Sequence, residues 1–140
     1  MHKDTIHVLM VDDNEDDVVL IREALETQDI RVVAVARDGE EALRYLRRSS
    51  RVQRPEIMLL DINMPVKDGF EVLGELKADP ALAPLPVVIL TTSQREEDVT
   101  RSYAAGASSF VTKPARPEEL RELARLFSLY WRRASRFPAA

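Results

Sequence analysis

Three acids, a hydroxyl and a lysine lie at the ends of short apolar runs in this sequence. The acids are Asp12, Asp13 and Asp61, the hydroxyl belongs to Thr91, and the lysine is Lys113. Carboxylates held close together raise one another's pKa unless positive charge compensates them. A lysine and a divalent cation such as Mg²⁺, which prefers oxygen ligands, would both compensate. One aspartate could then attack phosphorus, and the cation, the lysine and the hydroxyl would offset the charge of the phosphoryl group.

These residues can meet only if the apolar runs are strands of one sheet. Short β-prone runs alternate with segments of helical periodicity. The expected strands are residues 6–11, 31–36, 56–60, 86–91 and 108–112, and the expected helices begin after Asn14 and cover 41–48, 70–77, 98–105 and 117–134. Near-continuous apolar strands that alternate with helices are typical of a parallel sheet covered on both faces. We therefore predict an α/β three-layer sandwich that gathers the strand-end residues at one edge.

Each strand-end residue has an ordinary explanation when it is taken alone. An aspartate after a strand is often a helix cap or a loop residue, and Lys113-Pro114 could be a turn with a solvated lysine. Asp38, which follows the second run, is assigned to such a cap, as is Asn14. Joint placement at four strand ends of a single sheet is much harder to obtain by chance, which favours a shared site.

Length and composition narrow the class of protein. The 140 residues suffice for one domain, residues 1–140, and a net charge of −4 argues against nucleic-acid binding. The chain has no cysteine for disulfides or thiol chemistry. No signal peptide is visible, and no apolar run approaches the roughly 18–20 residues of a membrane helix. These features predict a cytoplasmic protein that does not enter a membrane.

Six short motifs occur along the chain in a fixed order. They are Val11-Asp12-Asp13-Asn14, Leu60-Asp61-Ile62-Asn63-Met64-Pro65, Asp68-Gly69, Leu90-Thr91-Thr92, Ala105-Gly106-Ala107 and Lys113-Pro114. This order resembles the receiver domain of two-component response regulators over about residues 5–133. The resemblance implies a flavodoxin-like sheet with strand order 2-1-3-4-5 and five helices. It also implies a module that accepts a phosphoryl group from a sensor histidine kinase. Because only a few residues remain after the last predicted helix, we expect no output domain and expect signalling through protein–protein contacts.

The resemblance also implies a role for individual residues. Asp61 is expected to be the phospho-acceptor. Asp12, Asp13, Asp61 and the backbone carbonyl of Asn63 are expected to hold Mg²⁺. Lys113 is expected to contact the phosphoryl group.

Two further residues are expected to form the switch of the receiver. Thr91 would shift toward the phosphoryl group, and Phe110 would change between an outward and an inward rotamer. Phe110 has no hydroxyl, unlike the tyrosine often found at this position, so the polar tip of the usual switch is missing. The family also implies a cis peptide bond between Lys113 and Pro114, since X–Pro bonds are where the cis form costs least.

Three other protein classes share part of this pattern. Haloacid-dehalogenase-like phosphatases also use a strand-end aspartate and Mg²⁺, but they need a second aspartate two residues later, where this chain has Asn63. A receiver-like domain with a purely structural role would lack one of the acids or the lysine, and none is missing. A Rossmann domain would carry a Gly-rich loop after its first strand. The pattern thus favours a phosphoryl acceptor that is not a conventional enzyme.

Several longer segments resemble a narrower group, the single-domain regulators paired with bacterial phytochrome histidine kinases. The segments are residues 13–17, 51–55, 71–80 and 86–93, together with the aromatic C-terminal tail. The expected partner is therefore a sensor histidine kinase such as a bacteriophytochrome.

The last predicted helix, residues 117–134, carries more apolar residues than one packing face needs. The stripe expected to pack on the sheet consists of Leu120, Leu123, Ala124, Phe127, Tyr130 and Trp131. Leu126 and Leu129 fall beside it, where they could widen the core face or form a partner surface. In the second case, Leu126 and Leu129 together with Tyr103 and Phe110 would form a homodimer face, built from the fourth helix, the fifth strand and the last helix.

Overall fold

The computed structural model describes residues 5–50 and 53–138, and its centre is a parallel sheet. Its strands are β1 (Ile6–Val11), β2 (Ile30–Ala36), β3 (Ile57–Leu60), β4 (Val87–Thr91) and β5 (Ser109–Thr112). They lie in the order β2-β1-β3-β4-β5, and every neighbouring pair is parallel. The predicted α/β fold and strand order are therefore confirmed. Of the segments that resemble phytochrome regulators, Arg51 and Val52 lie outside the described residues.

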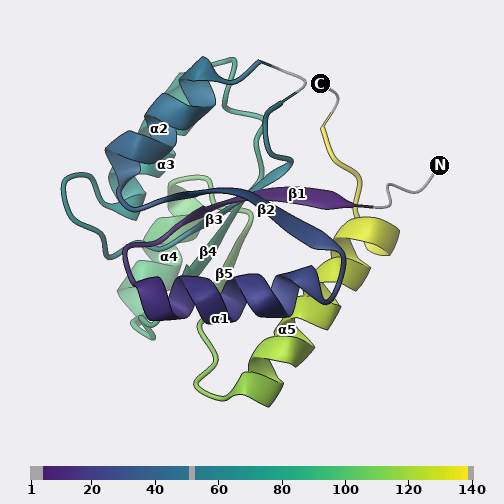
Figure 1. The fold of residues 1–140 in the computed structure, drawn as a ribbon. Coiled ribbons are helices and arrows are strands. Elements are labelled where there is room, and N and C mark those ends of the chain that lie inside the picture. Colours follow the sequence, from purple (N-terminus) through teal and green to yellow (C-terminus); the bar gives the residue numbers. More distant parts are fainter. Residues whose placement is uncertain (1–4, 51–52, 139–140) are drawn as a thin grey trace.

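Helices cover the sheet on both faces. They are α1 (Glu15–Glu26), α2 (Gly39–Arg48), α3 (Gly69–Ala78), α4 (Glu96–Ala104) and α5 (Pro117–Leu129), and α5 continues into the π-helical turn η1 (Tyr130–Ala134). Figure 1 shows α1 and α5 side by side on one face, with α2, α3 and α4 on the other. Helix α1 begins directly after Asn14 as predicted, and the bounds of α2, α3 and α4 match the predicted ones within two residues. The last predicted helix begins at Pro117 as expected, but its final turn is π rather than α.

Side-chain caps set where the helices begin. The Asn14 side chain accepts the Asp17 N–H at 3.0 Å, and the Asp38 side chain accepts the Glu41 N–H at 2.9 Å. Each cap satisfies one of the backbone donors that a helix start leaves free. The predicted caps Asn14 and Asp38 are therefore confirmed, and both helices begin immediately beyond a strand exit.

Alternate strand residues enter two separate cores. In β1, Val8 and Met10 pack toward α1 and α5, while Leu9 and Val11 pack toward α2 and α3. Every residue of β3 and β4 is buried, as expected for central strands of a doubly covered sheet. The core thereby holds the strand ends at the site in fixed positions.

The C-terminal helix buries most of its predicted stripe. Leu120, Ala124 and Trp131 are buried, but Tyr130 is 54% exposed, so its assignment to the packing stripe was wrong. Tyr130 lies at the margin of the stripe, and it meets Trp131 edge-on with ring centroids 5.1 Å apart. On the inner side, the Trp131 ring stacks on Phe137 at 5.3 Å, with the ring planes within 8°.

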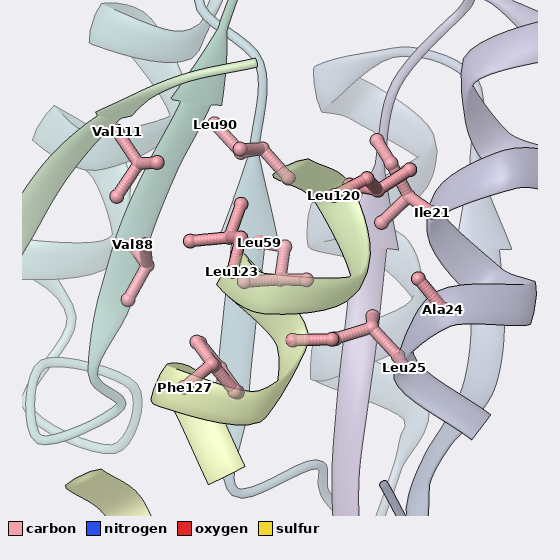
Figure 2. A pocket seen from close by; sticks show the side chains of 11 residues that line it. Ile21, Ala24, Leu25, Leu59, Val88, Leu90, Val111, Leu120, Leu123 and Phe127 are labelled. Carbon is pink, nitrogen blue, oxygen red and sulfur yellow. The ribbon is translucent and has the colours of Figure 1, made fainter. Parts of the chain in front are cut away.

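A small cavity lies between α1, α5 and the sheet. It has a volume of about 20 Å³. Its lining is apolar and comprises Ile21, Ala24, Leu25, Leu59, Val88, Leu90, Val111, Leu120, Leu123, Ala124 and Phe127 (Figure 2). A space of this size could hold a water molecule, but the lining offers no polar partner, so we expect it to be dry. The cavity leaves α5 incompletely packed against β4 and β5.

Candidate functional site

The exits of β1 and β3 bring three carboxylates together. Asp12, Asp13 and Asp61 each place one oxygen within 4.8 Å of the others. Asp12 is 2% exposed and Asp61 is 7% exposed, whereas Asp13 faces solvent. The Asp61 N–H donates to the Val11 carbonyl at 3.0 Å, which continues the hydrogen-bond ladder between β1 and β3 as far as the site. The strands thus position this acidic cluster directly.

Local turns fix the orientation of the two buried acids. The Asn14 N–H donates to Asp12 Oδ1 at 3.0 Å, and the Asn63 N–H donates to Asp61 Oδ1 at 3.1 Å. In each aspartate, one oxygen is therefore held by the backbone two residues later, and Oδ2 is left for other contacts. Gly69 packs so closely here that an added Cβ would lie 2.8 Å from the Asp61 carbonyl oxygen. This close approach accounts for the glycine of the Asp68-Gly69 motif.

Lys113, at the exit of β5, reaches into the acidic cluster. Its Nζ lies 2.7 Å from Asp12 Oδ2, 2.8 Å from Asp17 Oδ2 and 3.1 Å from Asp61 Oδ2. Burial disfavours the charged amine, but the hydrogen bonds with Asp12 and Asp17 and the attraction of Asp61 outweigh it and raise the pKa of Lys113. Lys113 is therefore a firmly protonated counterion for the cluster.

The peptide bond between Lys113 and Pro114 differs from the expectation. No cis peptide bond occurs among residues 5–50 and 53–138, so this bond is trans. The two isomers of an X–Pro bond differ by only about 0.5–1 kcal/mol, so local packing decides between them. The Lys113 N–H donates to the Thr91 carbonyl at 2.7 Å, and this bond continues the pairing of β4 with β5 as far as the lysine.

Asp17 is a member of the site that reasoning from the sequence missed. It sits in the first turn of α1, four residues after Asp13, and its carboxylate is the third partner of Lys113. The Asn14 cap that accepts the Asp17 N–H places it there. A signal was present in the run of acids at residues 15–17, but only the path of the Lys113 side chain shows which of these acids is used.

The two residues predicted to form the switch lie in the neighbouring strands β4 and β5. Thr91 is fully buried at the end of β4, and its Oγ1 accepts the Ser93 N–H at 3.4 Å. Phe110 is half-buried in β5 and packs against the core formed with α2 and α3. Tyr103, Leu126 and Leu129, assigned to the partner face, are all exposed.

The acidic cluster suits a hard divalent cation. Its donors are carboxylate oxygens, which Mg²⁺ and Mn²⁺ prefer. Burial raises the pKa of Asp12 above its ordinary value of 3.8, and the hydrogen bonds from Lys113 and from the Asn14 N–H only partly reverse this. Burial therefore disfavours the charged form of Asp12 even beside Lys113, and a bound cation would favour that form.

An Asp12→Asn variant should be more stable than the wild type in metal-free buffer near neutral pH. A raised pKa means that the native state binds the Asp12 proton more tightly than the unfolded state does. Ionised Asp12 therefore opposes folding, and its cost grows as the pH rises above about 4. Thermal unfolding across this range checks the effect, with Asp38→Asn as the control. A lower melting temperature for Asp12→Asn than for wild type near pH 7 in chelator would contradict it.

Comparison with known proteins shows relatives of nearly the same length. Response regulator Rcp1 of Synechocystis is 36% identical over 137 residues, which are 95% of this chain and 93% of Rcp1. The probable methanogenesis regulatory protein FilR2 of Methanothrix harundinacea is 35% identical, over 97% of this chain and 90% of FilR2. The likeness thus spans almost the whole of both chains in each case.

Solved structures give the same picture. The phosphorylated cyanobacterial phytochrome response regulator RcpA is 38% identical, with a TM-score of 0.86, over 96% of this chain and 99% of RcpA. The Mn²⁺-bound form of Rcp1 is 35% identical, with a TM-score of 0.82, over the same shares. The predicted resemblance to regulators of bacterial phytochromes is confirmed.

A protein-family model covers most of the described fold. The response regulator receiver domain matches residues 8–125. This range contains β1 from Val8 onward, the other four strands, the acidic cluster and Lys113. The chain therefore belongs to the response regulator receiver domain family.

Proposed function

We propose that this protein is a stand-alone response regulator of the cytoplasm that accepts a phosphoryl group on Asp61 from a sensor histidine kinase. The observation that carries the proposal is the contact of Asp61 Oδ2 with the protonated amine of Lys113 inside the acidic cluster. The similarity to RcpA, a cyanobacterial phytochrome response regulator, makes a bacteriophytochrome kinase the first candidate for the donor.

The geometry indicates the roles of Asp61 and Lys113 in the proposed phosphoryl transfer. Asp61 Oδ1 is held by the Asn63 N–H, which leaves Oδ2 as the attacking oxygen. A new O–P bond forms at Oδ2 while the N–P bond of the kinase phosphohistidine breaks, and the imidazole nitrogen recovers a proton. Lys113 can exchange its contact with Asp61 for one with a phosphoryl oxygen and stabilise the transferred charge.

Asp12, Asp13, Asp61 and the Asn63 carbonyl would hold Mg²⁺, which when bound offsets negative charge on the phosphoryl group. The Mn²⁺-bound structure of Rcp1 supports a divalent cation in a relative of this chain. Asn63 cannot act as the acid/base that a phosphatase of the haloacid-dehalogenase type requires. The protein therefore acts as a phosphoryl acceptor that later releases phosphate, rather than as an enzyme turning over external substrates.

Phosphotransfer profiling tests the function. Each purified histidine kinase of the source organism, autophosphorylated with ATP, is mixed with this protein and Mg²⁺. We expect label to move rapidly from one kinase, a bacteriophytochrome if the organism has one, and chelator to prevent the transfer. Absence of transfer from every kinase, together with no mass increase after treatment with acetyl phosphate and Mg²⁺, would refute the proposal.

We also propose that the protein forms a homodimer through α4, β5 and α5. Leu126 is 51% exposed, Leu129 is 39% exposed and Tyr103 is 50% exposed, and half-buried Phe110 adjoins Tyr103. Exposed apolar side chains on neighbouring elements are typical of a protein–protein contact surface. A second copy of the chain could cover this face in an isologous manner.

A Leu126→Lys variant should sediment as a monomer under conditions where the wild type forms dimers. The charge would have to be desolvated at the centre of the contact. Leu20→Lys, on α1 and at a similar exposure of 50%, should leave the dimer intact. Wild-type protein that stays monomeric at high concentration, with and without an acyl-phosphate mimic, would rule out this assembly.

A further inference from the structure

A side-chain hydroxyl of helix α4 contacts the backbone of strand β5. Tyr103 Oη accepts the Phe110 N–H at 3.2 Å. Within residues 5–50 and 53–138, strand β5 has a neighbour on one side only, because it pairs with β4 at the end of the sheet order. Backbone donors on an open edge otherwise face water or another chain. Tyr103 therefore ties α4 to the edge strand at the residue expected to act as the aromatic switch.

The end of α4 is built to hold Tyr103 in this position. The Gly106 N–H donates to the Tyr103 carbonyl, and the Ala107 N–H donates to the Ser102 carbonyl, both at 3.0 Å. This pair of bonds is a Schellman motif, and it needs a residue with positive φ, here Gly106 at 106°. The turn from α4 into β5 is thus closely defined, and so is the place of Tyr103 relative to Phe110.

The other end of α4 is connected to the candidate site. The Ser93 N–H donates to Thr91 Oγ1 at 3.4 Å, and Ser93 Oγ donates to the Asp98 carboxylate at 2.6 Å. Thr112 Oγ1 of β5 donates to the Ser93 carbonyl at 3.3 Å. Strand β5 is therefore tied at Thr112 to the loop before α4 and at Phe110 to the last turns of α4. A displacement of Thr91 would therefore affect both the hydrogen bond of Thr112 with Ser93 and that of Phe110 with Tyr103.

We propose that Tyr103 is a positioning residue that holds Phe110 and β5 in the resting arrangement, and that phosphorylation breaks its hydrogen bond with the Phe110 N–H. Because Phe110 has no hydroxyl of its own, the polar contact of the switch comes from the helix instead of from the strand side chain. The hydrogen bond between Tyr103 and Phe110 in the resting protein is argued from the structure alone. Its release on phosphorylation rests on the proposed function, in which Asp61 is the acceptor.

The test compares amide hydrogen exchange at Phe110 in wild type and in Tyr103→Phe, which removes only the hydroxyl. In the unphosphorylated protein, we expect Phe110 exchange to be about 2- to 10-fold faster in the variant, the range for loss of one hydrogen bond of ordinary net strength. Tyr130→Phe, in η1 and similarly exposed, is the control and should leave the exchange unchanged. Equal exchange in wild type and Tyr103→Phe would overturn the resting contact.

A second arm adds Mg²⁺ and beryllium fluoride, an acyl-phosphate mimic. In wild type, we expect Phe110 exchange to accelerate, whereas Tyr103→Phe should show little further acceleration. Tyr103→Phe should also bind the mimic about 2- to 10-fold more tightly, because the resting state that competes with binding is weakened. Binding without a change in Phe110 exchange would overturn the coupling alone. Failure of the mimic to bind would refute the proposed function and the coupling, and the resting contact would still be decided by the first arm.

Discussion

An Asp61→Asn variant should take up no phosphoryl label, either from a phosphorylated kinase or from acetyl phosphate with Mg²⁺. The amide oxygen of asparagine can still accept the Asn63 N–H that Asp61 Oδ1 accepts now, so the local turn should survive. What is lost is the anionic oxygen beside Lys113, and a neutral amide is a far weaker nucleophile toward phosphorus. Intact-protein mass spectrometry measures the loss directly as the disappearance of the phosphorylated species.

Asp38→Asn is a matched control for this experiment. Asp38 also follows a strand, but its side chain caps α2 through the Glu41 N–H, and asparagine caps a helix equally well. Labelling of Asp38→Asn should match that of wild type. Wild-type labelling of Asp61→Asn in the presence of Mg²⁺ would show that the acceptor lies elsewhere.

A Lys113→Ala variant should lose about 3–5 kcal/mol of unfolding free energy in metal-free buffer, the usual effect of removing one partner from a buried ion pair. Lys113 is 7% exposed and contacts three carboxylates, of which Asp12 and Asp61 are buried. Without the amine these acids repel one another with no compensating charge. Since Asp61 is retained, labelling should remain possible. The contact between Lys113 and the phosphoryl group, which would couple phosphorylation to β5, is lost.

Urea unfolding in chelator and in Mg²⁺ measures this effect. Mg²⁺ should return part of the lost stability, because a cation bound only by the native state shifts the equilibrium toward it. Lys67→Ala is the comparison, since Lys67 also pairs with two carboxylates, Glu40 and Glu75, but at the protein surface. Its loss should be much smaller. Lys113→Ala with wild-type stability in chelator would mean that the acidic cluster needs no lysine.

The acidic cluster could be predicted from the sequence because strand ends are simple to locate. Asp12, Asp61 and Lys113 each end an apolar run, and parallel strands expose such ends at one edge. Contacts that depend on side-chain direction could not be predicted in this way. The Asp17 contact requires the path of Lys113 across the cluster, and the bond between Tyr103 and Phe110 requires the turn geometry at the end of α4.

For the fold as well, the positions of the elements could be predicted from the sequence, whereas details that depend on packing could not. Periodicity located every strand and helix of the described chain, whereas the strand order came from the family resemblance. The position of Tyr130 was missed because a residue at the margin of an apolar stripe can face either way, and here the π-helical turn begins at Tyr130 itself. The isomer of the Lys113–Pro114 bond was missed because the sequence shows a proline, but not the packing that selects between two nearly equal forms.

The packing of Trp131 has a practical consequence for following this protein in solution. It is the chain's one tryptophan, it is 9% exposed, and it lies between Tyr130 and Phe137 where α5 passes into η1. Indole emission depends on the polarity and packing around the ring. The protein therefore carries its own optical probe at the end of α5, and unlabelled samples will report any repacking of that helix as a change in fluorescence.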